Sequence, residues 1–435
     1  MATSVERRMR RRTRVGLLAV GLAACTAAPA HGAADAIVAA GPDGGASFAW
    51  SQLGSPTLIQ ERSLTAAGAL SETQFVSPAT SGGALGEKIG TDSAGDAVIA
   101  WLGHDGSNWV VRARGRLATG GLTPLQRLSA PGYDANNLSL AVEPDGDAVV
   151  AWERYVGDYQ VIEARRRAAD GTLGPVHTLS YGAARSEYPD VAVAPDGTAT
   201  VVWLRHAGGD KQYIQARTIA ANGSLSATQT LTPTGLEAYT PSVSMDGAGR
   251  AVFGWTRTTS GGALIAETRA RSAGGVLSAP QRLSATGSIA FELVSAGDAT
   301  GRRVFAWLKR VGSVDSLAGR IRRADGTLSA EFPLGADDGI NPAVAIDPNG
   351  NATFAWHTDE DVSVVHSRRR SVAGTLGTIR TLSNPAQNAA APHVAVDPAG
   401  KATIAWYLPP SLYFAARTVT AGGTMSPIRL INGDS

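Results

Sequence analysis

Eight copies of one sequence pattern predict an all-β protein, an eight-bladed β-propeller built from four-stranded antiparallel blades. Each copy contains a tryptophan, and successive tryptophans lie 49 to 52 residues apart. A glycine precedes each tryptophan by six residues, and an arginine follows it by 11 to 14 residues. The recurring tryptophans are Trp50, Trp101, Trp152, Trp203, Trp255, Trp307, Trp356 and Trp406, and the arginines are Arg62, Arg114, Arg165, Arg217, Arg269, Arg320, Arg368 and Arg417.

Each copy is predicted to form four short strands joined by turns. In the fourth copy we expect strands at 190–194, 198–203, 213–219 and 225–231, with turns at 195–197 and 222–223. Gly197 and Gly223 occupy turn positions that need a positive φ, which residues with a Cβ adopt only at a cost. Valine and alanine alternate over 191–194, so both faces of this strand are apolar. Such a strand indicates a sheet that is covered on both sides, as blades are in a propeller.

The recurring tryptophan and arginine have structural roles in this prediction. The tryptophan would fill the space between neighbouring blades, where a large aromatic side chain contributes most. The arginine would pack its stem on that tryptophan or pair its head with a turn aspartate, because a catalytic group is not needed eight times. An open β-solenoid and a seven-bladed ring are the alternative architectures. A closed ring is favoured because stacked repeats need capped ends, and neither the first nor the last copy is atypical.

The segment 191–199 (Val-Ala-Val-Ala-Pro-Asp-Gly-Thr-Ala) resembles NHL-type propeller repeats. It also resembles the Asp-box of sialidases, an Asp- and Gly-containing hairpin that ends in an aromatic residue. The spacing departs from an Asp-box, since Asp145 precedes Trp152 by seven residues, and the units are longer than NHL repeats. The resemblance therefore implies the propeller fold over residues 35–435 and no catalytic residue. The whole chain is similar to repeat proteins secreted by actinobacteria.

The first 32 residues are predicted to be an export signal. An arginine-rich segment, 5–14, precedes a ten-residue apolar stretch, 15–24, which is too short to span a bilayer. Cys25 follows Leu-Ala-Ala in a string that resembles a lipobox, which implies lipid attachment at this cysteine. The alternative is cleavage after Ala30 or Gly32, and Arg11-Arg12 leaves twin-arginine export open. Either route predicts an extracytoplasmic protein, secreted or lipid-anchored, with one propeller domain over residues 33–435.

The charge distribution excludes several partners. Residues 1–24 carry six arginines and one glutamate, so the net charge of +2 becomes −3 for the remainder. The sequence has no basic stripe of the kind that indicates nucleic-acid binding, and we expect contact with a membrane only through a lipid on Cys25. The run 357–361 could offer carboxylates to calcium, but consecutive carboxylates in a loop rarely converge. We expect no metal, no cofactor, no internal disulfide and a monomer.

The variable loops are the expected binding surface. In a propeller, the loops that join the second to the third strand, and one blade to the next, share one face, and here they differ between copies. We predict that this face binds a polysaccharide or a protein without catalysis. The candidate binding residues are Trp109, Tyr155, Tyr159, Arg185, Tyr188, Arg205, His206, Tyr213 and Tyr239. The alternative is a sialidase-like glycoside hydrolase, which would need two carboxylates about the scissile bond, and no pair is marked by the sequence.

Overall fold

The computed structural model describes residues 37–79, 82–182, 184–208, 211–335 and 338–433, and it shows 32 strands in these ranges. The export signal and Cys25 lie outside the described residues. Blades 1 to 4 comprise β1 (Ile37–Ala40), β2 (Ala46–Gln52), β3 (Leu58–Leu64) and β4 (Gln74–Phe75); β5 (Ala84–Thr91), β6 (Ala97–His104), β7 (Trp109–Arg116) and β8 (Gln126–Arg127); β9 (Ala135–Val142), β10 (Ala148–Val156), β11 (Tyr159–Arg167) and β12 (Leu173–Thr178); β13 (Ser186–Val193), β14 (Ala199–His206), β15 (Gln212–Ile219) and β16 (Gln229–Thr230).

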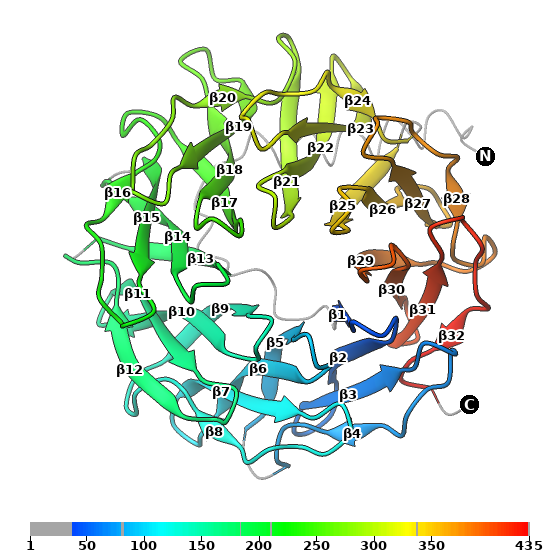
Figure 1. Ribbon diagram of the computed structural model, residues 1–435, viewed down its shortest axis with the longest axis horizontal. Helices are drawn as coiled ribbons and strands as arrows, with labels where there is room; N and C mark the ends of the chain where they lie inside the picture. Colours follow the sequence, from blue (N-terminus) through cyan, green and yellow to red (C-terminus); the bar gives the residue numbers. More distant parts are fainter. Residues whose placement is uncertain (1–36, 80–81, 183, 209–210, 336–337, 434–435) are drawn as a thin grey trace, which may run out of the picture. The chain divides into compact units, whose positions relative to one another are not determined.

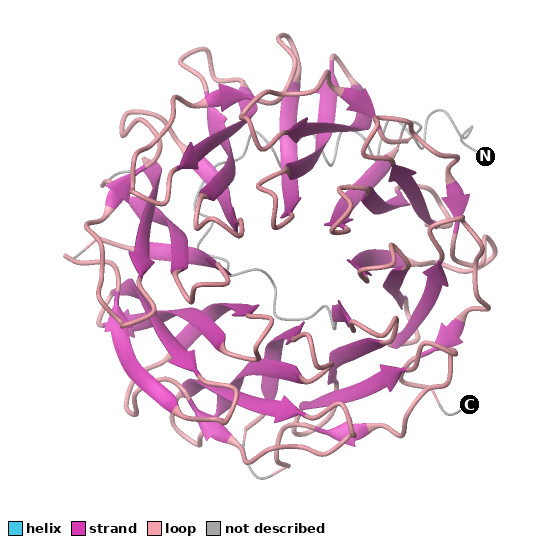
Figure 2. Ribbon diagram, in the orientation of Figure 1, coloured by secondary structure: helices cyan, strands magenta, loops and turns pink. Residues whose placement is uncertain are grey.

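Blades 5 to 8 repeat the arrangement. They comprise β17 (Ala238–Met245), β18 (Ala251–Thr258), β19 (Leu264–Arg271) and β20 (Gln281–Arg282); β21 (Ile289–Gly297), β22 (Arg303–Val311), β23 (Val314–Arg322) and β24 (Phe332–Pro333); β25 (Gly339–Ile346), β26 (Ala352–Thr358), β27 (Val365–Arg370) and β28 (Arg380–Thr381); β29 (Ala390–Val396), β30 (Ala402–Leu408), β31 (Tyr413–Val419) and β32 (Arg429–Leu430). Each blade is an antiparallel four-stranded sheet in chain order, and the eight sheets surround a central axis (Figures 1 and 2). The predicted eight-bladed propeller is confirmed, and the solenoid and the seven-bladed ring are excluded.

The fourth strand of most blades is shorter than expected. In the fourth copy, β16 covers two residues, whereas the sequence predicted a strand over 225–231. Leu225 forms only an isolated bridge to Ile219. Arg217 Nε donates to the carbonyl oxygen of Ser226 at 2.7 Å, and regular pairing resumes at Gln229. The equivalent bond from Arg165 to Gly174 coexists with the six-residue strand β12, so this bond does not by itself shorten the strand.

The recurring arginine joins neighbouring blades through backbone carbonyls, which corrects the expected pairing of its head with a turn aspartate. In every blade its Nε donates to a carbonyl of the same blade and its Nη1 donates to the preceding blade. Arg62 Nη1 reaches the oxygen of Ile431 at 3.1 Å, which links the first blade to the last. A carbonyl accepts such bonds with definite direction, so one arginine per blade sets the spacing between sheets.

The recurring tryptophans fill the spaces between blades, as predicted. All eight are at most 2% exposed. Trp203 of blade 4, for example, packs with Val149, Ile162 and Leu179 of blade 3 in one apolar cluster. Burying an indole contributes several kcal/mol at about 25 cal/mol per Å², so these contacts dominate the cohesion of the ring.

A bulge interrupts the innermost strand in seven of the blades for which pairing is described. One residue at each bulge has a positive φ: Gly86, Asn137, Tyr188, Thr240, Glu292, Asn341 and Ala391. Six of these are not glycine, and their φ values lie between 40° and 54°. A bulge redirects a side chain, and non-glycine residues in this conformation are costly. The bulges therefore present variable side chains at one end of the innermost strands.

Candidate binding face

The variable loops share one face, which we call the loop face. The turns between first and second strands, and between third and fourth strands, form the opposite turn face. On the loop face, several linkers between blades bond to the end of a second strand; for example, His206 N donates to Arg185 O at 2.9 Å, and Tyr155 N to Asp134 O at 2.9 Å. These bonds position the linker residues over the blade that follows them.

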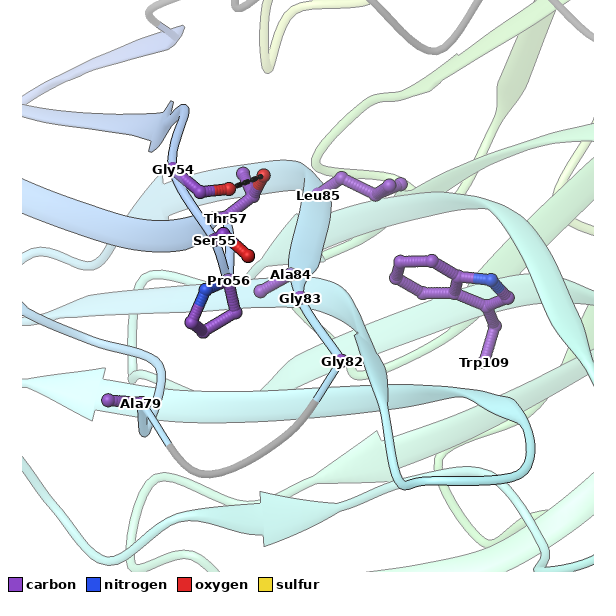
Figure 3. A pocket seen from close by; sticks show the side chains of 10 residues that line it. All are labelled: Gly54, Ser55, Pro56, Thr57, Ala79, Gly82, Gly83, Ala84, Leu85 and Trp109. Carbon is purple, nitrogen blue, oxygen red and sulfur yellow. Dashed lines mark hydrogen bonds between the residues drawn. The ribbon is translucent and has the colours of Figure 1, made fainter.

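A groove of about 630 Å³ lies on this face between blades 1 and 2. Figure 3 shows Trp109, at the start of β7, on one side and residues 54–57 on the other. The lining residues are Gly54, Ser55, Pro56, Thr57, Ala79, Gly82, Gly83, Ala84, Leu85 and Trp109. The groove thus combines one indole with hydroxyls and glycine-rich backbone. This pairing of an apolar ring face with hydrogen-bonding groups suits a sugar ring.

Trp109 is held in place from two sides. Its backbone N–H donates to Asp134 Oδ1 at 2.8 Å, and its ring lies edge-to-face with His104 at a centroid distance of 5.3 Å. A Cβ at Gly82 would come within 2.7 Å of His104 Nδ1, so a larger residue there would force the His104 side chain to shift. The indole itself is half-buried, so one of its surfaces remains available to a ligand.

Exposed tyrosines gather on blades 3 and 4, which follow the blade of Trp109 around the ring. Among the described residues, five tyrosines are at least 36% exposed: Tyr133, Tyr155, Tyr181, Tyr188 and Tyr413. The first four lie between the end of blade 2 and the bulge of blade 4, whereas Tyr413 begins the third strand of blade 8. We refer to these four tyrosines, together with Trp109, as the aromatic arc. Four of the five thus fall within residues 133–188, a small part of the 435-residue chain.

A buried carboxyl network supports the arc at blades 3 and 4. Glu153, which is 1% exposed, accepts bonds on Oε1 from Asn137 Nδ2 at 2.7 Å and from Tyr188 N at 2.8 Å. It therefore connects the bulges of two neighbouring blades. Burial raises the pKa of Glu153 to about 7, and the nearby Glu187 carboxylate adds to the rise.

Glu187 behaves in the opposite way. Burial opposes its ionisation, but bonds from His206 and Arg185 outweigh that effect and lower its pKa. His206 Nε2 lies 2.8 Å from Glu187 Oε2, and Arg185 pairs with Oε1. Arg185 Nε also donates to Gln160 Oε1 at 3.1 Å. Two adjacent carboxyl groups thus have pKa values shifted in opposite directions.

The structure places the other predicted residues in different surroundings. Arg205 is 9% exposed, and its guanidinium donates to Ala184 O, Ser186 Oγ and Tyr181 O, so it fastens the linker before blade 4. Tyr159 and Tyr213 are half-buried at the starts of β11 and β15. Tyr239, in blade 5, donates its hydroxyl to Glu237, and burial followed by this bond raises its pKa.

Sequence reasoning missed Glu153, Tyr133 and Tyr181 as site residues. A signal for Glu153 was present: the residue after the recurring tryptophan is leucine in three copies, but glutamate here and histidine at position 357. His357 is 6% exposed, and burial lowers its pKa to about 4. No group of three or more metal-binding side chains occurs within the described ranges, the run 357–361 included. The part of the chain described by the structure contains no helix of the length and apolarity needed to cross a membrane.

Comparison with known proteins establishes the fold alone. The sequence matches no protein-family model and none of the curated proteins. A lectin from Burkholderia pseudomallei is 13% identical, with a TM-score of 0.53 over 80% of this chain and 99% of the lectin. A puromycin hydrolase is 15% identical (TM-score 0.52), and a puromycin-hydrolysing peptidase of Mycobacterium tuberculosis is 14% identical (TM-score 0.50). The match covers 87% and 92% of this chain but only 59% and 53% of those two proteins.

Proposed function

We propose that this protein is an extracytoplasmic, non-catalytic module that binds a polysaccharide chain along the aromatic arc. The observation that carries the proposal is the grouping of exposed tyrosines on the two blades that follow Trp109 and its groove. Aromatic faces stack on the apolar faces of sugar rings, while hydroxyls, amides and Arg185 supply hydrogen bonds. An arc of separated rings suits an extended ligand that contacts several of them.

The shape of the site supports binding in preference to turnover. The groove is open, and its lining contains no ionisable side chain. The similar fold of a protein named a lectin is consistent with this function, whereas the two puromycin-hydrolysing proteins extend well beyond the matched region. We further propose that the protein acts as a monomer at the cell surface, held by a lipid on Cys25.

Affinity measurements on a glycan array test the proposal. We expect Trp109→Ala and Tyr188→Ala each to weaken binding of a retained polysaccharide at least tenfold, which corresponds to about 1.4 kcal/mol. Tyr413→Ala is the matched control, since its ring is 45% exposed against 43% for Tyr188 but lies outside the arc. Equal losses in all three variants, or binding unaffected by both arc variants, would show that the arc is not the site.

One observation favours a second function, a glycoside hydrolase. Glu153 and Glu187 have pKa values shifted apart, as an acid and a base in one site would have. The hydrogen bonds of these two carboxyl groups with Tyr188, Arg185 and His206 favour a supporting role. The same array detects released sugar. If the wild type releases sugar, and Glu153→Gln still binds the polysaccharide but releases none, the protein is a glycoside hydrolase and the proposal of a non-catalytic module is wrong.

A further inference from the structure

Five arginines of blades 5 to 7 gather on the turn face, away from the aromatic arc. They are Arg250, Arg302, Arg322, Arg323 and Arg370. Arg250 connects two turns of blade 6, because its Nη2 donates to Thr300 O at 3.2 Å and its Nη1 to Ala324 O at 3.4 Å. Thr300 and Ala324 lie within two residues of Arg302 and Arg323, so the two turns that Arg250 joins also carry these two arginines. Arg302 continues to blade 7, where its Nη1 donates to Gly350 O at 3.3 Å.

Arg370 is the member of this group without an acceptor. Its counterparts in blades 3 and 6 donate from Nε to a glutamine on the preceding blade: Arg167 to Gln126 at 2.7 Å and Arg322 to Gln281 at 3.2 Å. The preceding blade of Arg370 carries Phe332 at that position, and the ring centroid lies 4.5 Å from the guanidinium carbon. Arg370 Nε is consequently buried without a hydrogen-bond partner among the described residues. The Nε atoms of Arg116, Arg271 and Arg303 are likewise buried without a partner, so this feature alone does not mark a site. Arg370 differs in facing two further arginines, Arg323 and Arg302.

Three of these arginines form no ion pair among the described residues, although Arg323 acts on the nearby Asp325, whose pKa is lowered by bonds from Thr327 and then by the charges of Arg323 and Arg322. Arg250 pairs with Asp246 at 2.5 Å. In contrast, Arg302, Arg323 and Arg370 have no carboxylate within 4.0 Å in the portion of the chain that is described. Burial lowers the pKa of Arg370, and the charges of Arg323 and Arg302 lower it further. Like charges held together are unfavourable unless an anion offsets them.

We propose that Arg302, Arg323 and Arg370 form a binding site for an oxyanion, a phosphate or sulfate group, between blades 6 and 7 on the turn face. Guanidinium groups bind such anions through paired N–H bonds, which would satisfy the free donors of Arg370. The site is independent of the aromatic arc, because it lies on the other face and uses charge instead of stacking. Its ligand is either a free anion or the same group carried on a polymer.

Thermal unfolding of the full chain in pyrophosphate and in dextran sulfate tests this site, with ionic strength held constant by sodium chloride. A ligand that binds only the native state raises Tm, and we expect a rise of about 1–3 °C. Arg370→Gln should abolish the rise. Arg167→Gln, the equivalent change in blade 3, should retain it. Neutral dextran should have no effect on any of the proteins.

The two variants also differ without ligand. Arg167→Gln removes the hydrogen bond that Gln126 accepts from Arg167, so we expect the Tm of this variant to fall. Arg370→Gln removes a charge whose Nε has no hydrogen-bond partner, so its Tm should be unchanged or higher. If both probes raise the Tm of the wild type and Arg370→Gln abolishes both rises, the site binds a free anion. If only dextran sulfate raises Tm and Arg370→Gln abolishes that rise, the site binds an anion carried on a polymer. No rise in the wild type, or a rise that persists in Arg370→Gln, would overturn the proposal.

Discussion

Glu61 shows how a single buried side chain can make the stability of the protein depend on pH. Its exposed fraction is 0%, and the nearest cationic atom, Nε of Arg116 in the next blade, is 3.8 Å from its Oε2. Burial raises the pKa of Glu61 from 4.5 to about 7, although Arg116 opposes the shift. The folded protein therefore retains a proton between pH 4.5 and pH 7 that the unfolded chain releases.

The sign of this effect gives a prediction. Because the pKa is higher in the folded state, the stabilisation is fully present below pH 4.5 and is lost as the pH rises through 7. Glu61→Gln keeps the shape of the protonated side chain, so we expect its free energy of unfolding to exceed that of wild type by about 1–3 kcal/mol at pH 8. The advantage should vanish at pH 4.5.

Urea unfolding at both pH values measures this difference. Glu72→Gln is the control, since Glu72 is exposed and its removal should change little at either pH. A loss of stability in Glu61→Gln at pH 8 would mean that the ionised carboxylate and Arg116 form a net favourable pair, which contradicts the prediction.

At the scale of the strand, the bulges place side chains at the ends of the innermost strands at a cost in stability. Tyr188 and Asn137 adopt positive φ values that cost about 1 kcal/mol or more for residues other than glycine. Glu153 joins both bulges and so helps to offset that cost at blades 3 and 4. At blade 5, Thr240 has a φ of 49° and a β-branched side chain, the least suitable kind for this conformation.

Thr240→Gly should therefore stabilise the protein. Glycine adopts this φ without strain, and we expect a gain of about 1 kcal/mol in the free energy of unfolding, measured in urea. Thr230→Gly is the comparison, because Thr230 is an exposed strand residue outside the positive-φ positions, and glycine there should destabilise. A loss at both positions would show that the Thr240 side chain contributes more than its backbone strain costs.

At the scale of the molecule, the ring closes through side chains and sheet faces, without an exchanged strand. Each blade takes its four strands from one continuous segment. The first and last blades meet through Arg62 and the carbonyl oxygen of Ile431, the same bond that joins every other pair of neighbours. The junction at the chain ends is thus chemically equivalent to the other seven.

This equivalence predicts local opening at whichever junction is weakened. Arg62→Met removes two charge-assisted bonds, at a cost of about 2–4 kcal/mol, and should increase amide hydrogen exchange in blades 1 and 8. Arg217→Met should do the same in blades 3 and 4. Increased exchange around the whole ring in both variants would instead show that the blades unfold as one unit.

The sequence by itself determined the repeat, the number of blades and the burial of the tryptophans. These features follow from local patterns, such as glycine in turns and apolar residues on both faces of a strand, which need no knowledge of neighbours. It also identified the loop face and many residues on it, including Trp109 and Tyr188.

Only the tertiary structure decided what lies beside what. The arc joins residues from Trp109 to Tyr188, and Glu153 connects bulges 51 residues apart, Asn137 and Tyr188. The recurring arginine was assigned the wrong partners because a backbone carbonyl on the preceding blade has no signature in the sequence. The isolation of Arg370 depends on Phe332 replacing a glutamine across the junction between two blades. Contacts across such a junction depend on how the sheets pack face to face, and that geometry exists only once the ring has formed.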